Sequence, residues 1–356
     1  MSTEPSELSE LSKTPELATK FELAKIQALP KCELHIHLEG CITLPQIQAL
    51  SVSTDSAPPR PFERLFTVTS LQDFLNTLDW ICGLYKDGHS LQHLAQQFAA
   101  YAKQQQLQYV ELIVNPSHWR TIHLDTLFGN LNEAFDREFQ NGGPDVRMLP
   151  SLGRHQSAID AKQLADWMIH CDLPRICGLS IDGSESVSGS NNERFAPAFH
   201  RVQAHGFKTT AHAGESSGAE GVIEALDILG VQRIDHGVRA AESPELLDRL
   251  AETQTALNVC VSSNCSLLYS NLSEHPLPAL LAAGVPCTLN TDDPVILDIT
   301  MNSELAELRE AFGWTLDDLV KFQENAINAA FCEAETKSQL IQQLKEYQPL
   351  ASGETS

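Results

Sequence analysis

Apolar residues recur along the chain in eight short runs that alternate with longer amphipathic segments. The runs are nearly continuous in apolar residues, which is typical of parallel strands that are covered on both faces. Between most of them, apolar positions follow helical spacing, and several of these segments end in Gly, a common helix stop. The expected strands are residues 33–38, 109–114, 146–152, 176–181, 208–213, 233–238, 256–262 and 286–291.

Eight strands that alternate with helices predict an α/β protein, a (β/α)8 TIM barrel with additional helices between strands one and two. A doubly wound open sheet is the competing architecture, but neither GxGxxG nor GxxxxGK[ST] follows the first strand. The length of 356 residues suits one barrel. We expect a flexible acidic N-terminus over residues 1–15, a single barrel domain over 16–347, and a flexible tail over 348–356.

Composition narrows the classes of partner. The chain has 24 basic and 47 acidic residues, a formal net charge of -23, which argues against nucleic acid or an anionic membrane and favours a small-molecule partner. Its nine cysteines form no CxxC pair and are expected to be reduced thiols. The N-terminus has no secretory pattern, and no apolar run approaches about 20 residues. We expect a cytoplasmic protein, and the oligomeric state is not readable from these patterns.

Polar residues with chemically useful side chains recur at the carboxyl ends of the expected strands. In a (β/α)8 barrel these ends form the rim where active sites lie. Polar residues scattered through a core would not keep to one end of each strand. The residues are His35, His37, Asn115, His155, Asp182, His212, Glu215, His236, Asn264, Asp292 and Asp293.

The first two histidines stand in ELHIHLEG. Because side chains alternate along a strand, His35 and His37 share one face and can reach one metal ion, although two structural histidines would give the same pattern. HAGE adds His212 and Glu215, and Gly214 would let the backbone turn so that the carboxylate faces the same cleft. The alternative for HAGE is an isolated strand histidine before a glutamate at a helix start.

Two later motifs complete the set. IDHG places His236 at another strand end, where a structural His–Asp pair is the alternative, and NTDDP places Asp292 and Asp293 after the last strand. Adjacent acids repel unless a cation or donor is near, although Asp is also common at helix N-termini. Several imidazoles, one carboxylate and an open position suit zinc. The residues alone therefore predict a mononuclear metal hydrolase.

The order and spacing of these motifs resemble the adenosine deaminase family of metal-dependent (β/α)8 hydrolases. The similarity runs from LPKCELHIHLEG at residue 29 to ENAINAAFC near residue 332, and it includes SLQDFL, YVELIVNPSH, GRHQ, RIDHGVRA and SSN. The resemblance implies one Zn2+ per chain and hydrolytic removal of the 6-amino group of a purine. The zinc ligands it implies are His35, His37, His212 and Asp292.

The resemblance also implies roles for three further side chains. Protonated Glu215 would give a proton to purine N1 and make C6 electrophilic, which a dry pocket would favour by raising the pKa of Glu215. His236 would orient the hydroxide nucleophile and act as its base and electrostatic partner, and Asp293 would hydrogen-bond purine N7. ICGLSIDG contains no lysine, which binuclear relatives often place there, so one metal is expected rather than two.

The identity of the purine is indicated by residues that differ between adenine-specific and adenosine-specific members of the family. This chain has HLEG, with Glu39, as do members that act on free adenine, whereas adenosine-specific members have HLDG. Residues 182–185 read DGSE and combine features of both groups, because Gly183 matches the glycine whose N–H meets purine N3. The resemblance places four residues at the substrate, namely Asp293, Gly183, Glu39 and His37.

We expect adenosine or 2′-deoxyadenosine as substrate, giving inosine or 2′-deoxyinosine and ammonia. The alternatives are adenine, which would give hypoxanthine, another N9-substituted aminopurine, and a catalytically silent relative that only binds. A silent relative would be expected to lack a metal ligand, Glu215 or His236, and all are present. Val261 and Asp298 depart from the family pattern at positions that are not expected ligands.

Overall fold

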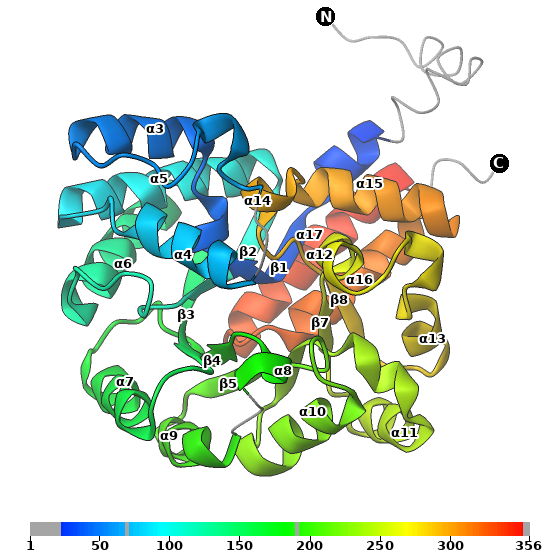
Figure 1. Cartoon of the computed structure of the whole chain (residues 1–356). Coiled ribbons are helices and arrows are strands. Elements are labelled where there is room, and N and C mark those ends of the chain that lie inside the picture. The colour runs from blue at the N-terminus through cyan, green and yellow to red at the C-terminus, as the bar shows by residue number, and fades with distance from the viewer. Residues whose placement is uncertain (1–22, 68–70, 189–191, 352–356) are drawn as a thin grey trace, which may run out of the picture.

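The computed structural model describes residues 23–67, 71–188 and 192–351. Eight parallel strands are hydrogen-bonded in sequence order and surrounded by helices (Figure 1). A bridge between Ile36 and Asp292 joins the first strand to the segment after the last, which closes the barrel and excludes the open sheet. The strands are β1 (Lys31–His37), β2 (Leu107–Val114), β3 (Asp145–Gly153), β4 (Gly178–Asp182), β5 (Lys208–Ala213), β6 (Arg233–His236), β7 (Leu257–Val259) and β8 (Cys287–Leu289).

The helices confirm the expected alternation and the additional helices between β1 and β2. Those between β1 and β2 are η2 (Glu39–Cys41), α3 (Leu44–Ser53), η3 (Phe62–Arg64), α4 (Leu71–Cys82) and α5 (Gly88–Gln104). Between β2 and β6 lie α6 (Leu124–Gln140), α7 (Ala158–His170), α8 (Glu185–Ser188), α9 (Asn192–Ala204), α10 (Ala219–Glu224) and η4 (Ala225–Leu229). After β6 come η5 (Val238–Glu242), α11 (Pro244–Thr253), α12 (Val261–Leu267), η6 (Leu272–Glu274), α13 (Leu277–Ala282), α14 (Pro294–Leu297), α15 (Met301–Phe312), α16 (Leu316–Ala329) and α17 (Ala334–Ala351).

Local sequence explains where several of these helices begin and end. Reciprocal capping boxes start α7 at Ser157 with Asp160, and α16 at Thr315 with Asp318. Helix α15 ends at Gly313, whose φ of 65° is a conformation that glycine adopts without steric cost.

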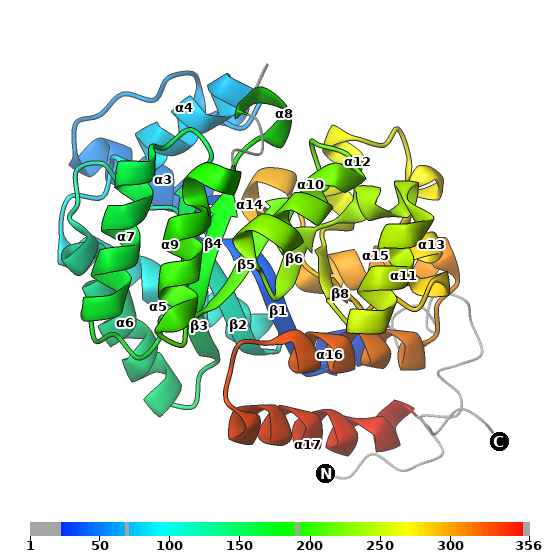
Figure 2. The same cartoon turned by 90° about the horizontal axis from the view of Figure 1, so that it is seen from below.

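The two ends of the barrel differ in chemistry. Figure 2 shows α16 and α17 together at one end, and the short helices α8, α12 and α14 toward the other. Near α16, Nη2 of Arg233 lies 2.6 Å from Oε2 of Glu111, inside the barrel. The hydroxyl of Tyr109 donates to Oε1 of Glu111 at 2.9 Å, and the Arg233 guanidinium lies 3.9 Å from the centre of the Phe331 ring. The buried ion pair of Arg233 and Glu111 thus fills one end of the barrel. The opposite end remains available for a functional site.

The structure corrects two sequence expectations. The seventh strand, expected to reach residue 262, ends at Val259, and residues 261–267 form α12. The polar segment SESVSGSNNE over 184–193 predicts a loop, but it contains α8 and the start of α9. Asn264, one of the rim residues, lies just after β7 as part of α12.

The expected terminal segments are only partly described. The backbone of α17 continues to Ala351, inside the tail expected over 348–356. Residues 1–15 and 352–356 lie outside the described residues. Within the described ranges, no helix is both long and apolar enough to cross a membrane.

Candidate metal and catalytic site

Strand β1 supplies two histidines to the carboxyl end of the barrel. His35 is fully buried, and the side chain of His37 is 14% exposed at the mouth. The backbone of this strand pairs with Asp292, whose N–H donates to the carbonyl of His35 and whose carbonyl accepts from the N–H of His37. Oε1 of Glu33 accepts hydrogen bonds from the backbone N–H (2.8 Å) and the hydroxyl (2.6 Å) of Thr291. These contacts fix Asp292 beside both histidines.

Four side-chain atoms meet at spacings that suit one metal ion. Nε2 of His35 lies 3.1 Å from Oδ1 of Asp292, and Nε2 of His37 lies 3.5 Å from the same oxygen and 3.2 Å from Nε2 of His212. A tetrahedral zinc site with nitrogen and oxygen ligands has edges of about 3.3 Å, given metal–ligand distances near 2.0–2.1 Å. The donor set and its spacings therefore fit a single zinc ion.

A second grouping of four residues overlaps this one. One ligand atom from each of His35, His212, His236 and Asp292 lies within 4.8 Å of the others. In this set His236 replaces His37, and its Nε2 is 4.0 Å from Oδ2 of Asp292. The sets share three residues, so they differ only in which histidine is the fourth ligand.

The charges around the cluster favour a cation. Burial disfavours the charged form of His35, yet Asp235 and Asp292 outweigh it and raise the pKa of this imidazole to about 10. Burial lowers the pKa of His37 to about 4 and that of His212 well below its usual value, so these rings keep a lone pair for a metal. The site thus combines two imidazoles that stay neutral, His37 and His212, with two buried carboxylates that stabilise positive charge at His35.

Asp235 on β6 lies behind the proposed ligands. Its Oδ1 is 3.2 Å from Nδ1 of His35, and its Oδ2 is 3.8 Å from Nδ1 of His212. The side chain of Asn258 donates to Oδ1 at 2.8 Å, and the hydroxyl of Ser180 donates to Oδ2 at 3.5 Å. A carboxylate behind a ligating histidine orients the ring and increases its basicity. Sequence reasoning treated this residue only as the partner in a structural His–Asp pair.

Asp235 and His236 are adjacent, yet both side chains face the site. Alternation along a strand would send them to opposite faces. His236 has φ of 63°, as does Asp292, and this left-handed conformation turns the chain at the strand end. Asp292 and its neighbour Asp293 reach the site in the same way. In each of the two pairs, Asp235–His236 and Asp292–Asp293, both side chains therefore face the site.

Glu215 lies beside His236, as expected from HAGE. Gly214 has φ of 65°, and a Cβ there would lie 2.5 Å from a methyl of Val222, so the turn requires glycine. Oε1 of Glu215 is 3.5 Å from Nδ1 of His236. Burial raises the pKa of this carboxyl, which favours its protonated form.

Asp293 and Glu39 are two further buried carboxyls at the site. A Cβ on Gly40 would lie 2.0 Å from Oδ1 of Asp293, so the HLEG glycine allows close contact between η2 and this carboxyl. Burial and the charge of Asp292 raise the pKa of Asp293 well above its usual value. Burial likewise raises the pKa of Glu39, which is 2% exposed. Neither carboxyl has a basic side chain within salt-bridge distance among the described residues.

Glu39 is held by two residues, of which Asn115 was among the rim residues from the sequence and Trp119 was not. Its Oε1 accepts from the backbone N–H of Asn115 at 2.9 Å and from Nε1 of Trp119 at 2.7 Å. The amide of Asn115 also donates to Oδ1 of Asp182 at 2.7 Å. Trp119 is fully buried against Tyr85. The sequence signal was the NPSHW segment that follows β2, which identified the location but not the contact with Glu39.

Two further residues from the sequence are exposed, namely Gly183, which the resemblance places at the substrate, and His155, one of the rim residues. Gly183, at φ of 89°, follows β4 and is exposed, so glycine suits the backbone there. His155 is also exposed and is absent from the metal-binding group found among the described residues.

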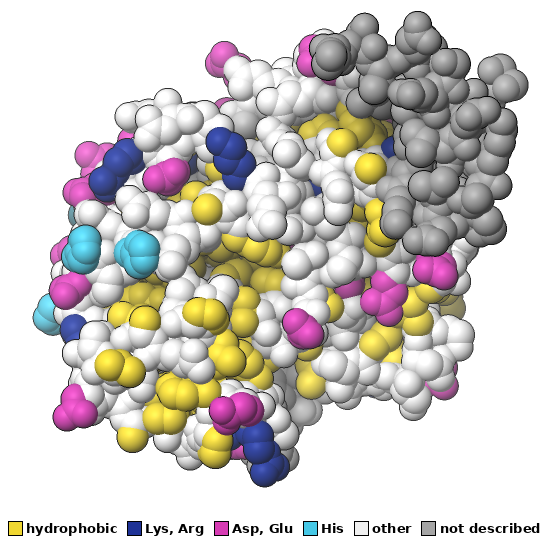
Figure 3. Space-filling view, turned by 90° about the horizontal axis from the view of Figure 1, so that it is seen from above, with side chains coloured by type: hydrophobic (Ala, Val, Ile, Leu, Met, Phe, Trp, Pro, Cys, Tyr) yellow, Lys and Arg dark blue, Asp and Glu magenta, His cyan; other side chains and the backbone are white. Residues whose placement is uncertain are grey.

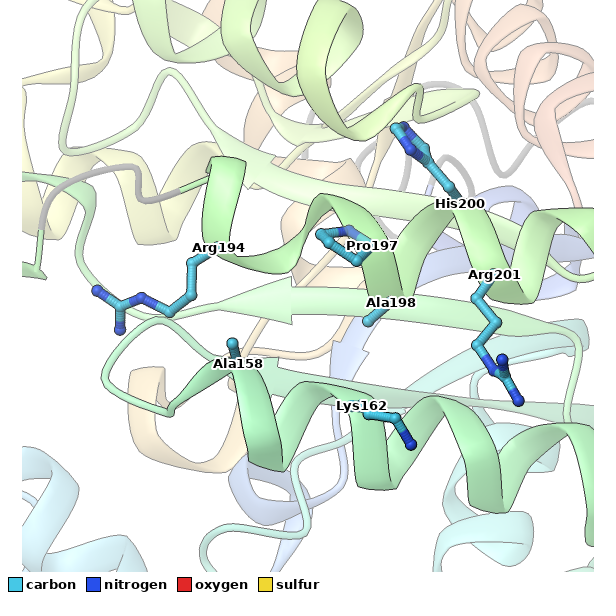
Figure 4. A pocket seen from close by; sticks show the side chains of 7 residues that line it. All are labelled: Ala158, Lys162, Arg194, Pro197, Ala198, His200 and Arg201. Carbon is cyan, nitrogen blue, oxygen red and sulfur yellow. The ribbon is translucent and has the colours of Figure 1, made fainter.

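Two hollows lie away from the histidines. One, of about 520 Å³, lies between α7 and α9, where the polar ends of Arg194, His200 and Arg201 point in different directions (Figure 4). The other, of about 350 Å³, is bordered by α3, α5 and α14 and includes Asp298. Figure 3 shows apolar side chains gathered in the hollowed middle of one face. Asp298 has φ of 55°, a conformation in which glycine is favoured.

Comparisons with known proteins agree with this geometry. The family description "Adenosine deaminase" matches residues 30–347. An adenine deaminase from Streptomyces coelicolor is 32% identical over 315 residues, which cover 86% of this chain and 92% of that protein.

Two solved structures have the same fold. The crystal structure of an adenine deaminase from Arthrobacter aurescens superposes with a TM-score of 0.84 at 25% identity, covering 90% of this chain and 99% of that one. An amidohydrolase from Burkholderia ambifaria, crystallised with bound zinc, gives a TM-score of 0.84 at 26% identity, covering 94% and 95%.

Proposed function

The chain belongs to the adenosine deaminase family and is a hydrolytic purine deaminase, and we propose that its substrate is free adenine, which it converts with water to hypoxanthine and ammonia. The observation that carries this choice is the buried carboxyl of Glu39, which lies near enough to Asp293 for its charge to raise the pKa of that carboxyl. The choice departs from the adenosine expected from sequence and agrees with the name of the Streptomyces coelicolor relative.

The contacts of Glu39 suit a free base better than a nucleoside. Oε1 is used by Asn115 and Trp119, whereas Oε2 is buried and has no hydrogen-bond partner within the described part of the chain. Free adenine carries an N–H on its imidazole ring that can donate to such an oxygen. A nucleoside has a sugar in place of that hydrogen, and a buried acceptor would then remain unpaired, at a cost of about 1–3 kcal/mol.

Zinc would be held by the four closely spaced side chains. It would bind the three imidazole Nε2 atoms and Oδ1 of the carboxylate, namely those of His35, His37, His212 and Asp292. When bound, zinc lowers the pKa of a water molecule toward about 7 and so supplies a nucleophile.

Two carboxyls outside the zinc ligand set, those of Glu215 and Asp293, donate hydrogen to nitrogen atoms of the purine. Protonated Glu215 gives its proton to N1, which makes C6 electrophilic and open to attack by water, and ammonia leaves from that carbon. Protonated Asp293 donates a hydrogen bond to N7. The raised pKa values of both carboxyls support these roles. His236 lies beside Glu215, and its part in the reaction depends on which ring nitrogen carries the proton.

The test is ammonia release from adenine, adenosine, 2′-deoxyadenosine and an N9-alkylated adenine by zinc-loaded protein. We expect kcat/KM for adenine to exceed that for each N9-substituted purine by at least about 100-fold. A higher kcat/KM for adenosine would reject adenine as the substrate.

An isosteric variant tests the contact itself. In Glu39→Gln, Oε1 can keep both of its hydrogen bonds while the amide NH2 would meet the ring N–H of adenine, donor against donor. We expect kcat/KM for adenine to fall about 100-fold, and Glu242→Gln, an exposed change of the same kind, to have no effect. An unchanged value in folded Glu39→Gln would remove Glu39 from substrate recognition.

A further inference from the structure

His236 can act in two different ways, depending on the position of its ring proton. Its Nδ1 lies 3.2 Å from Nδ2 of Asn264 and 3.5 Å from Oε1 of Glu215. Its Nε2 faces the metal cluster, 4.0 Å from Oδ2 of Asp292. With a bare Nε2, His236 could ligate zinc or remove a proton, whereas with Nε2–H it can only donate a hydrogen bond.

The proton position can be traced from a backbone group outside the site. The N–H of Leu277, at the start of α13, donates to Nδ1 of His275 at 3.1 Å. A backbone N–H cannot accept, so Nδ1 of His275 must be the acceptor and carry no hydrogen. His275 is 3% exposed, and burial lowers its pKa to about 4, so the ring is neutral at pH 7. The proton of neutral His275 therefore lies on Nε2.

That proton determines the orientation of the next side chain. Nε2 of His275 lies 3.3 Å from Oδ1 of Asn264, which accepts the hydrogen bond. The amide oxygen of Asn264 is thereby turned toward His275, and its NH2 group faces Nδ1 of His236 at 3.2 Å. Asn264 is fully buried and His236 is 1% exposed, so water does not compete for these bonds.

We propose that His275 and Asn264 are positioning residues that keep Nδ1 of His236 as a hydrogen-bond acceptor and its proton on Nε2, so that His236 donates a hydrogen bond to the reacting oxygen rather than ligating zinc or acting as a base. The assignment of a reacting oxygen rests on the proposed function, whereas the proton position does not. It also selects His37 as the fourth zinc ligand, because Nε2 of His236 has no lone pair to offer and its Nδ1 is taken by Asn264.

The proton position is measurable without any rate. Long-range ¹H–¹⁵N correlation spectra of zinc-loaded wild-type protein with ¹⁵N-labelled histidine distinguish protonated from bare ring nitrogens, and the spectrum of His236→Gln identifies the His236 signals. We expect protonated Nε2 and bare Nδ1 for both His236 and His275. A bare Nε2 on His236 would overturn the proposal, whether or not the protein deaminates adenine.

Variants of the two positioning residues test whether the proton position matters. Asn264→Asp has nearly the same shape but cannot donate to Nδ1 of His236, so Nδ1 should become protonated in the spectra. The kcat for adenine should fall about 100-fold, in the range seen when a preorganised donor is lost, with KM changing less than threefold. Asn271→Asp, an exposed change of equal charge in the same segment, is the control and should retain wild-type kcat.

His275 is tested by loss and rescue. His275→Leu removes the donor to Asn264 and should lower kcat about tenfold, whereas His275→Gln supplies an amide donor near the same place and should restore most of it. Equal loss in both variants would show that His275 acts by packing alone and would reject its positioning role. Wild-type kcat in Asn264→Asp together with an altered proton position would reject the function assigned to that proton.

Discussion

The carboxylate of Asp235 should control zinc affinity although it does not reach the metal. It faces Nδ1 of His35 at 3.2 Å and Nδ1 of His212 at 3.8 Å. Asp235→Asn removes a buried negative charge, and its Oδ1 can keep the bond from Asn258 while an NH2 group then faces His212. Loss of such a partner behind the ligands typically weakens metal binding about 10–100-fold.

The distances from Asp235 to the two histidines indicate where the increase in zinc Kd should lie within the range of about 10–100-fold. Only the His35 contact is at hydrogen-bond distance, so we expect zinc Kd to rise about 10–30-fold, near 1.4–2 kcal/mol. Competition with a chromogenic chelator at pH 7.5 measures Kd, and circular dichroism verifies that the variant is folded. Asp227→Asn is the matched control, since Asp227 is exposed and pairs with Arg249. An unchanged zinc Kd in folded Asp235→Asn would refute the assignment of this carboxylate to the metal site.

Three further predictions follow from other buried groups. Glu215→Gln should retain zinc but lower kcat about 10²–10⁴-fold because an amide has no acidic proton to give. Since burial raises the pKa of Glu215, the kcat of the wild-type protein should fall as pH rises through that pKa. A pH-independent kcat would contradict the role of Glu215 as a proton donor. Glu111→Gln leaves Arg233 buried without its counter-charge and should lower the free energy of unfolding in urea by about 3–5 kcal/mol, and a loss below 1 kcal/mol would show that the pair is dispensable. Burial lowers the pKa of His275 from 6.5 to about 4, so its neutral form stabilises the fold above pH 6.5 and this contribution is lost as pH falls to 4; in His275→Gln that part of the pH dependence should disappear.

The barrel could be predicted because its strands are buried on both faces. In a run such as residues 109–114, Glu111 is the one charged residue, so the pattern stays almost continuously apolar, and β2 is found there. The errors are at the strand ends. Cys260 and Val261 continue the apolar character of β7, but the strand ends at Val259 and residues 261–267 form α12. Periodicity over three or four residues cannot separate a strand end from the first turn of a buried helix.

The histidines and acids of the site were found because the carboxyl ends of parallel strands converge at one rim. Residues that act through another residue were not found, because their contacts depend on tertiary distance. Trp119 reaches Glu39 from beyond the end of β2, and His275 reaches His236 through Asn264. No spacing along the chain encodes these pairings, and a buried Trp or His is more often part of a core.

The backbone at His236 and Asp292 explains why the site can be so compact. A left-handed conformation costs a residue with a side chain about 1–2 kcal/mol, and here both residues have φ of 63°. The gain is that consecutive residues face one site, which strand alternation forbids. Asp235 thus lies behind His35 while Nε2 of His236 lies 4.0 Å from Oδ2 of Asp292, and Asp292 contacts His35 while Asp293 contacts η2. Replacing either residue with glycine would relieve the strain but remove the side chain that it positions, so the strained conformation is retained because it places two functional groups from each strand end.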